Sequence, residues 1–152
     1  MQLTDKQNEY IDSCIRNSIL PKNVKIFEAF YFGSTKKSSE HLYQLILSGK
    51  KKATTSALAS FKNGIIPKVG DISLIISYKG SPLALIQTTQ VLVTTFNHLT
   101  YDQIKDEGEC ETLESWRFNH QDFFMRDGLR NAYAFSEDMP VVFEHFKVIH
   151  IK

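Results

Sequence analysis

The sequence SGKKKATTS at Ser48–Ser56 places three consecutive lysines one residue before three consecutive hydroxyl side chains. A hydroxyl becomes a good nucleophile when a base takes its proton, and a lysine can be that base only if its pKa is lowered. Three adjacent ammonium groups would lower this pKa, because like charges disfavour the protonated form. Charge runs are also typical of solvated turns. The stretch is therefore either a basic turn after a helix or part of a catalytic site.

The whole chain has the composition of a soluble globular protein. It has 152 residues, of which 42% are hydrophobic and 23% charged, and a formal net charge of +1. We expect one domain over residues 1–152, with residues 1–22 as an N-terminal helical extension. The near-neutral charge argues against a nucleic-acid binder that is basic over its whole surface, but allows a local basic patch.

The sequence gives no sign of a membrane segment, metal site or cofactor site. No apolar run approaches the roughly 18 residues of a spanning helix, and the N-terminus lacks a signal-peptide core, so we expect a cytoplasmic protein. Cys14 and Cys110 are far apart, which predicts free thiols. The five histidines show no zinc-site spacing, so we predict no bound metal, and no cofactor.

Apolar spacing and turn residues predict an α+β fold. They favour helices at residues 4–17, 38–49, 101–107 and from Thr112 onward, with a short helix at 57–63. Ser38 or Ser39 is the predicted cap of the second helix, and Gly49 ends it. Strands are predicted at residues 72–78, 83–95 and 141–151, and an aromatic segment at 24–34 crosses the core. Uneven connections between these strands favour a small β-barrel or strongly curved mixed sheet surrounded by helices.

Several short motifs, in this order, resemble the ASCH domain family, whose β-barrel is related to the PUA domain of RNA-modifying proteins. The resemblance covers residues 30–150 and is closest to the bacterial stand-alone branch. It is carried by FGS at 32–34, LSGKKKATTS at 47–56, KVGD at 68–71, EGE at 107–109, TLESWR at 112–117 and EDMPVV at 137–142.

This resemblance implies a protein that binds or acts on nucleosides or RNA. One branch of the family hydrolyses the amide of N4-acetylcytidine with a Lys, a Thr and a Glu. The glycine-x-lysine-x-x-threonine pattern puts the first two on Lys51 and Thr54, and the glutamate three positions before the Thr-Leu pair is Glu109. Thr54 would then attack the acyl carbon, Lys51 would take its proton, and Glu109 would orient or tune the lysine. The alternative is an RNA-binding module or ribonuclease that uses the same basic cleft.

Further residues are candidates for contacting a nucleoside or RNA. An aromatic beside a glycine and a hydroxyl could wall a pocket for a flat ligand, lysines could contact phosphates, and an indole could stack on a base, although helical spacing also favours a core position for it. These candidates are Phe32, Ser34, Lys50, Lys52, Thr55, Lys68, Trp116 and Arg117. Ser56 departs from the family, because an arginine often stands there.

Geometry gives the catalytic interpretation two requirements. Lys51 and Thr54 would point to opposite faces of a regular strand, so the chain must bend between them, with strand pairing starting no earlier than about Thr54. The fold must also bring the acidic loop with Glu109 over the basic turn with Lys51.

Overall fold

The computed structural model describes all 152 residues. Its helices are α1 (Asp5–Arg16), α2 (Lys36–Leu47), α3 (Tyr101–Ile104) and α4 (Leu113–Asn131). Its strands are β1 (Ile26–Phe30), β2 (Ala53–Ala57), β3 (Ile72–Ile76), β4 (Pro82–Thr95) and β5 (Pro140–Ile151). Four 3-10 turns complete the chain: η1 (Leu58–Ser60), η2 (Lys62–Gly64), η3 (Phe96–His98) and η4 (Lys105–Glu107).

The five strands form one mixed sheet in the order β1-β3-β4-β5-β2. β1 is parallel to β3, and the other neighbours are antiparallel. The register between β4 and β5 shifts twice, at Leu85/Ile86 and at Thr88/Gln90, and such irregularities bend a sheet. The predicted α+β fold with a curved mixed sheet is confirmed. The sheet is not closed into a barrel, because β1 and β2 stand at its two edges and do not pair with each other.

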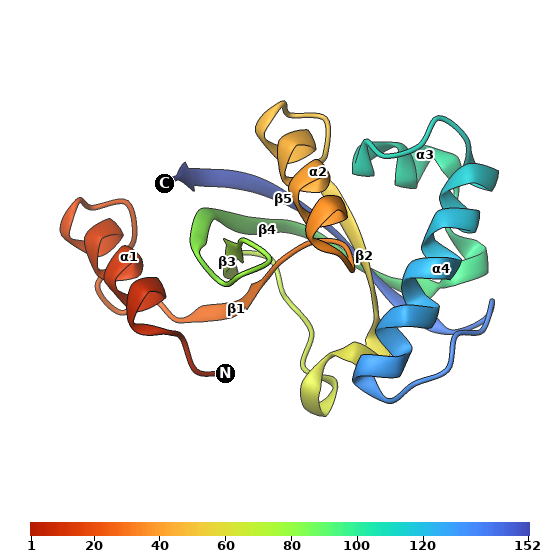
Figure 1. Cartoon of the computed structure of the whole chain (residues 1–152), viewed down its shortest axis with the longest axis horizontal. Helices are drawn as coiled ribbons and strands as arrows, with labels where there is room; N and C mark the ends of the chain where they lie inside the picture. The colour runs from red at the N-terminus through yellow and green to blue at the C-terminus, as the bar shows by residue number, and fades with distance from the viewer.

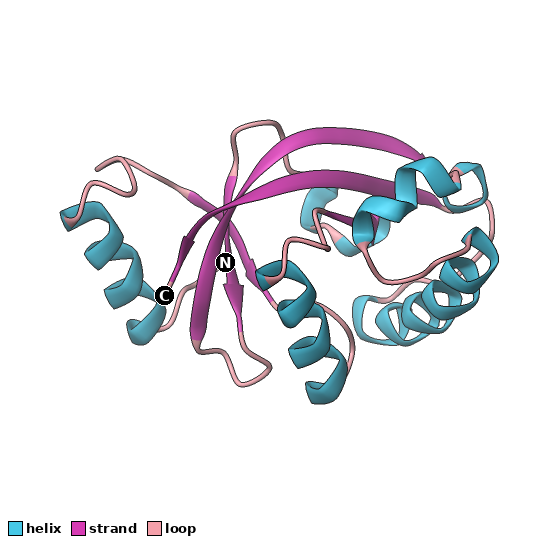
Figure 2. Ribbon diagram, turned by 90° about the horizontal axis from the view of Figure 1, so that it is seen from above, coloured by secondary structure: helices cyan, strands magenta, loops and turns pink.

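The helices lie along the sheet, with α1 and α4 at opposite ends of the molecule and α2 between them (Figures 1 and 2). Each of these three helices covers its own apolar cluster. Tyr10 and Cys14 of α1 pack on β3 and β4, Ile46 of α2 packs beside Phe32, and the α4 residues Trp116 and Phe124 pack against β2 and β5. None of the helices is both long and apolar enough to cross a membrane.

Helix caps agree in part with the sequence. Of the two cap candidates that the sequence offers for α1, Thr4 and Asp5, the structure has Thr4, whose hydroxyl accepts from the Gln7 N–H. α2 is capped by Thr35, so the prediction of Ser38 or Ser39 is wrong. Ser38 instead completes a capping box, in which the Thr35 hydroxyl accepts from the Ser38 N–H and the Ser38 hydroxyl accepts from the Thr35 N–H.

The short helix predicted at 57–63 is absent. The chain leaves β2 at Ala57 and passes through η1 and η2, which are separated at Phe61 by extended backbone. Asn63 has a φ of 56°, which no α-helix accommodates. The helix predicted at 101–107 is present as α3 followed by η4. Both cysteines are free, as predicted.

Candidate functional site

A cavity of about 410 Å³ lies between the two free edges of the sheet. One wall is the end of β1 and the following residues 30–34, and the other is β2. α2, the acidic loop at 107–110 and α4 enclose the rest. The volume is in the range of small-molecule sites, which is roughly 300–1,000 Å³.

Lys51 enters this cavity from the turn that follows α2. Its N–H bonds to the carbonyl of Leu45, which holds the turn against the helix end. The side chain is buried, with only 3% of the residue exposed. Its Nζ donates to the Ala53 carbonyl at 2.9 Å and to Glu109 Oε2 at 2.7 Å, and lies 3.5 Å from Glu107 Oε1. The predicted contact between the basic turn and the acidic loop is therefore present.

Gly108 allows the acidic loop to lie directly against the backbone of the basic turn. Its φ is 70°, and a Cβ at this position would overlap the carbonyl of Lys50. The Lys52 N–H also donates to the Asp106 carbonyl at 2.8 Å. Backbone contacts thus clamp the two segments together, and the side chains of Glu107 and Glu109 reach Lys51 from this clamp.

Glu107 is a fully buried carboxylate that four side chains surround, two by hydrogen bonds and two by ion-pair contacts. Its Oε2 accepts from the Thr55 hydroxyl at 2.8 Å and from the Trp116 indole N–H at 3.1 Å. Its Oε1 faces Lys51 Nζ at 3.5 Å and His120 Nε2 at 3.4 Å. Burial alone would raise the pKa of Glu107, but the two nearby cations and these hydrogen bonds hold it well below its ordinary value.

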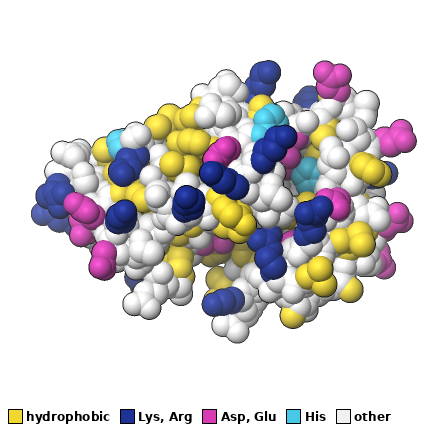
Figure 3. All heavy atoms as spheres, viewed as in Figure 1, with side chains coloured by type: hydrophobic (Ala, Val, Ile, Leu, Met, Phe, Trp, Pro, Cys, Tyr) yellow, Lys and Arg dark blue, Asp and Glu magenta, His cyan; other side chains and the backbone are white.

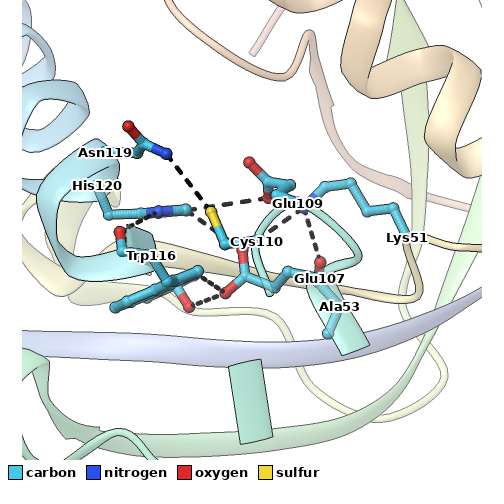
Figure 4. Close-up of polar contacts among 9 residues, drawn as sticks. Lys51, Ala53, Glu107, Glu109, Cys110, Trp116, Asn119 and His120 are labelled. Atoms are coloured by element: carbon cyan, nitrogen blue, oxygen red, sulfur yellow. Dashed lines mark hydrogen bonds and ion pairs between the residues drawn. The ribbon is translucent and has the colours of Figure 1, made fainter. Parts of the chain in front are cut away.

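His120 faces the carboxylates from the side opposite Lys51 (Figure 4). Its Nδ1 is 2.9 Å from the Trp116 carbonyl, so this nitrogen carries a hydrogen. Nε2 points at Glu107 Oε1 and lies 3.9 Å from Glu109 Oε2. Burial lowers the pKa of His120, but Glu107 and then Glu109 outweigh it and raise the pKa above its ordinary value. The ring stacks on Trp116, with centroids 4.1 Å apart.

The charge on Lys51 differs from the sequence-based expectation. Lys50 and Lys52 are exposed whereas Lys51 is buried, so the three ammonium groups are not crowded together. Burial lowers the pKa of Lys51, but the carboxylates of Glu109 and Glu107 raise it above its ordinary value. The expected depression by neighbouring lysines is therefore wrong, and Lys51 is an ammonium in this structure.

Thr54 lines the same cavity from β2. Strand pairing begins at Ala53, one residue before the predicted limit, and Lys51 lies outside the strand in the turn. The predicted limit on strand pairing is therefore not met, but Lys51 and Thr54 still line the same cavity. The Thr54 hydroxyl makes no hydrogen bond to Lys51, whereas the neighbouring Thr55 hydroxyl is bonded to Glu107.

The other predicted contact residues divide into two groups. Phe32, Ser34 and Thr55 line the cavity, and the Phe32 ring centroid lies 5.3 Å from Lys51 Nζ. Lys50, Lys52, Lys68, Trp116 and Arg117 do not line it.

Three residues of the second group have their polar groups or rings engaged elsewhere. Lys68 pairs with Asp71 at 3.1 Å on the surface. Trp116 is completely buried in the core and offers no face for base stacking. The Arg117 guanidinium donates to the backbone carbonyls of Asn97 and Leu99. Figure 3 shows Lys and Arg side chains dispersed among acidic ones on one face of the molecule, rather than gathered in a basic groove.

Sequence reasoning missed Glu107 and His120 as members of the site. Other cavity residues without a predicted role are His41, Cys110, Asn119, Asp122 and Phe123. One signal could have found His120: it follows Trp116 by four positions on a helix next to the acidic loop, so both side chains face that loop.

Glu107, Glu109 and His120 carry atoms within 4.8 Å of one another, which is close enough to consider a cation between them. The Lys51 ammonium already fills this role, since it lies within 3.5 Å of both carboxylates. The group is better described as an ion-pair cluster around a lysine than as a metal centre.

Comparisons with known proteins identify the family that has this fold. A search of the curated proteins found no match. The crystal structure of an ASCH domain from Lactobacillus crispatus is similar, with a TM-score of 0.82 and 28% identity over 98% of this chain and 97% of that chain. A protein from Enterococcus faecalis is also similar, with a TM-score of 0.81 and 28% identity over 93% of this chain and 86% of that chain. Residues 28–150 match the ASCH domain. The chain therefore belongs to the ASCH domain family and has its PUA-like fold, with an open five-stranded sheet.

Proposed function

We propose that this protein hydrolyses the amide of an acylated pyrimidine nucleoside such as N4-acetylcytidine, with Lys51, Thr54 and Glu109 as the reacting set. The observation that carries the proposal is the buried Lys51–Glu109 ion pair at 2.7 Å, inside a nucleoside-sized cavity whose wall also includes Thr54. Charged groups held away from water are typical of catalytic sites.

The charge of the cavity favours a neutral ligand. Its wall carries the carboxylates of Glu107, Glu109 and Asp122, against the cations Lys51 and His120. Both cations already face these carboxylates, so neither is free to receive a phosphate. A nucleoside suits this wall better than a nucleotide or an RNA backbone.

The ion pairs of Lys51 with Glu109 and Glu107, which raise its pKa, support the following roles within the set. An ammonium cannot take the Thr54 proton, so Glu109 is the better base, and its Oε1 has no hydrogen-bond partner. Lys51 is suited to stabilise the oxyanion that forms on the acyl oxygen.

The reaction then has two stages. The Thr54 hydroxyl oxygen bonds to the acyl carbon, its proton passes to Glu109, and the carbonyl electron pair moves to oxygen beside Lys51. When this intermediate collapses, the bond from the acyl carbon to N4 breaks, and the leaving nitrogen takes the proton from Glu109. In the second stage the oxygen of a water molecule bonds to the acyl carbon of the acyl-Thr54 ester, and Glu109 takes the water proton. Glu109 then returns this proton to the Thr54 oxygen as the ester bond breaks. The products are cytidine and a carboxylic acid.

Incubation with N4-acetylcytidine, followed by chromatography for cytidine, tests this function. Thr54→Val and Glu109→Gln should each lower the rate by about 100-fold or more, and Lys51→Ala should do the same. Thr89→Val, at an exposed threonine of β4, is the matched control and should leave the rate unchanged. No cytidine from the wild type at stoichiometric enzyme would overturn the proposal. RNA binding that weakens steeply with salt would then favour a binding module or ribonuclease.

A further inference from the structure

β2 presents its edge to the cavity, and not only one of its faces. Thr54, Thr55 and Ser56 are consecutive, and all three line the cavity. Alternate residues of a strand point to opposite faces, so a wall made from one face would skip every second residue. β2 pairs only with β5, so its other edge is free. The main chain of this free edge is therefore part of the wall.

The register of β2 and β5 shows which main-chain groups point to the free edge. Ala53 lies opposite His145, so Lys52 lies opposite Phe146, whose N–H donates to the Lys52 carbonyl at 3.0 Å. Hydrogen-bonded and non-bonded pairs alternate in an antiparallel ladder. Thr54 and Ser56 therefore bond to β5, while the N–H and C=O groups of Ala53, Thr55 and Ala57 point away from it.

Two of these three outward carbonyls already have partners. The Ala53 carbonyl accepts from Lys51 Nζ at 2.9 Å, and the Ala57 carbonyl accepts from the Ser60 hydroxyl at 2.7 Å. Both contacts confirm the direction that the register requires. Neither the N–H nor the C=O of Thr55 has a hydrogen-bond partner outside the ladder. Thr55 thus leaves one donor and one acceptor, side by side, at the wall of the cavity.

The opposite wall suits a flat ring. Phe30, Tyr31 and Phe32 line the cavity across from β2, and Phe123 lines it from α4. Phe32 is held in place by edge contact with Phe30, at 4.8 Å between centroids. Aromatic side chains stack on bases, and main-chain groups can read their edges by hydrogen bonding.

We infer that the main-chain N–H and C=O of Thr55 bind the edge of a planar heterocycle that carries a donor beside an acceptor. In cytidine, the product of the proposed function, on which this identification of the ligand rests, the Thr55 C=O accepts from N4–H and the Thr55 N–H donates to ring N3. Uridine presents the reverse order of donor and acceptor, so this edge discriminates against it.

Amide NMR of the wild-type protein with cytidine tests the inference without any turnover. Saturating cytidine should shift the Thr55 amide resonance and slow its hydrogen exchange. The Ala57 amide also points outward but does not line the cavity, so it is the internal control and should not change. 3-Deazacytidine, which has C–H in place of N3, should bind about 5- to 10-fold more weakly, the loss expected for one neutral hydrogen bond.

Substitution of Thr55 by proline removes its main-chain N–H donor. Thr55→Pro should weaken cytidine binding about 5-fold or more, while Ala57→Pro, the matched change on the same strand, should not. If Thr55→Pro does not fold, amide NMR of the wild type and the comparison of cytidine with 3-deazacytidine still test the inference. The inference is overturned if cavity amides shift while Thr55 does not, or if saturating cytidine shifts none of them. If the enzyme releases cytidine but the Thr55 amide does not shift, the hydrolase proposal stands and this inference fails. If the Thr55 amide shifts but no cytidine is released, the binding site stands and the hydrolase proposal fails.

Discussion

Replacing Glu107 by glutamine is the most informative test of the ion-pair cluster. The substitution keeps the size of the side chain and removes its charge. In the native protein Oε2 of Glu107 accepts hydrogen bonds from Thr55 and Trp116, and Oε1 forms ion-pair contacts with Lys51 and His120. All four partners are donors, so the site is built for an acceptor-only group.

A glutamine cannot satisfy this site in either orientation. Its amide has one oxygen and one NH2 group, and whichever side receives the NH2 brings it against two donors. Lys51 also loses one of its two carboxylates. Breaking a buried ion pair by removing one partner costs about 3–5 kcal/mol of unfolding free energy. For a chain of this size, each kcal/mol corresponds to about 2–4 °C, so Tm should fall by about 6–20 °C.

Urea and thermal denaturation at pH 7 measure this loss. Glu111→Gln is the matched control, because Glu111 lies in the same acidic segment but is exposed and forms no ion pair. We expect the control to change stability by less than about 0.5 kcal/mol. A loss of under about 1 kcal/mol for Glu107→Gln, with the fold intact, would show that Glu107 does not anchor the cluster.

Three further changes test other parts of the structure. The pKa of His120 is raised in the folded protein. The stability that His120 adds relative to His120→Gln should therefore be fully present below about pH 6.5 and be lost as pH rises through the pKa of His120 in the folded state. Urea titrations at several pH values would measure this difference. Burial and the neighbouring Glu144 raise the pKa of Glu28 to about 7. The wild type therefore loses stability as pH rises from about 4.5 to 7. Glu28→Gln should be more stable than the wild type by about 1–3 kcal/mol at pH 8 and equally stable at pH 4, as urea denaturation at the two pH values would show. Gly108→Ala should destabilise the protein by more than about 2 kcal/mol, since it combines a left-handed φ with a clash against the Lys50 carbonyl; an unchanged urea midpoint would refute the clamp between the two segments.

The fold class was predictable from the sequence, but the nature of β2 was not. Its sequence ATTSA has no large apolar residue, so it carries no alternation that marks a strand. The structure explains this composition: Ala53 and Ala57 pack in the same cluster as Trp116, Phe124 and Phe143, and only small residues leave room for these rings. A strand with such short side chains can be identified only when its packing partners are known.

Within the site, the pairing of Lys51 with Glu109 was predictable because motif order placed both residues in a known pattern. The roles of Glu107 and His120 were not. They depend on four donors that come from β2, α4 and the turn after α2 and meet at one carboxylate. The protonation of Lys51 was mispredicted for the same reason, because sequence counts neighbouring charges along the chain, whereas the pKa responds to neighbours in space.

The two carboxylates around Lys51 have separable roles. An ammonium has three donors, which here face the Ala53 carbonyl, Glu109 and Glu107. A substrate oxyanion has to displace one of them, and the contact to Glu107 is the weakest, because 3.5 Å is beyond the ordinary N–H···O range. Glu107 would keep its bonds to Thr55 and Trp116 after this displacement, whereas Glu109 has no other hydrogen-bond partner. Glu107→Gln should therefore reduce mainly stability, and Glu109→Gln mainly activity. Equal effects of both changes on stability would contradict this division.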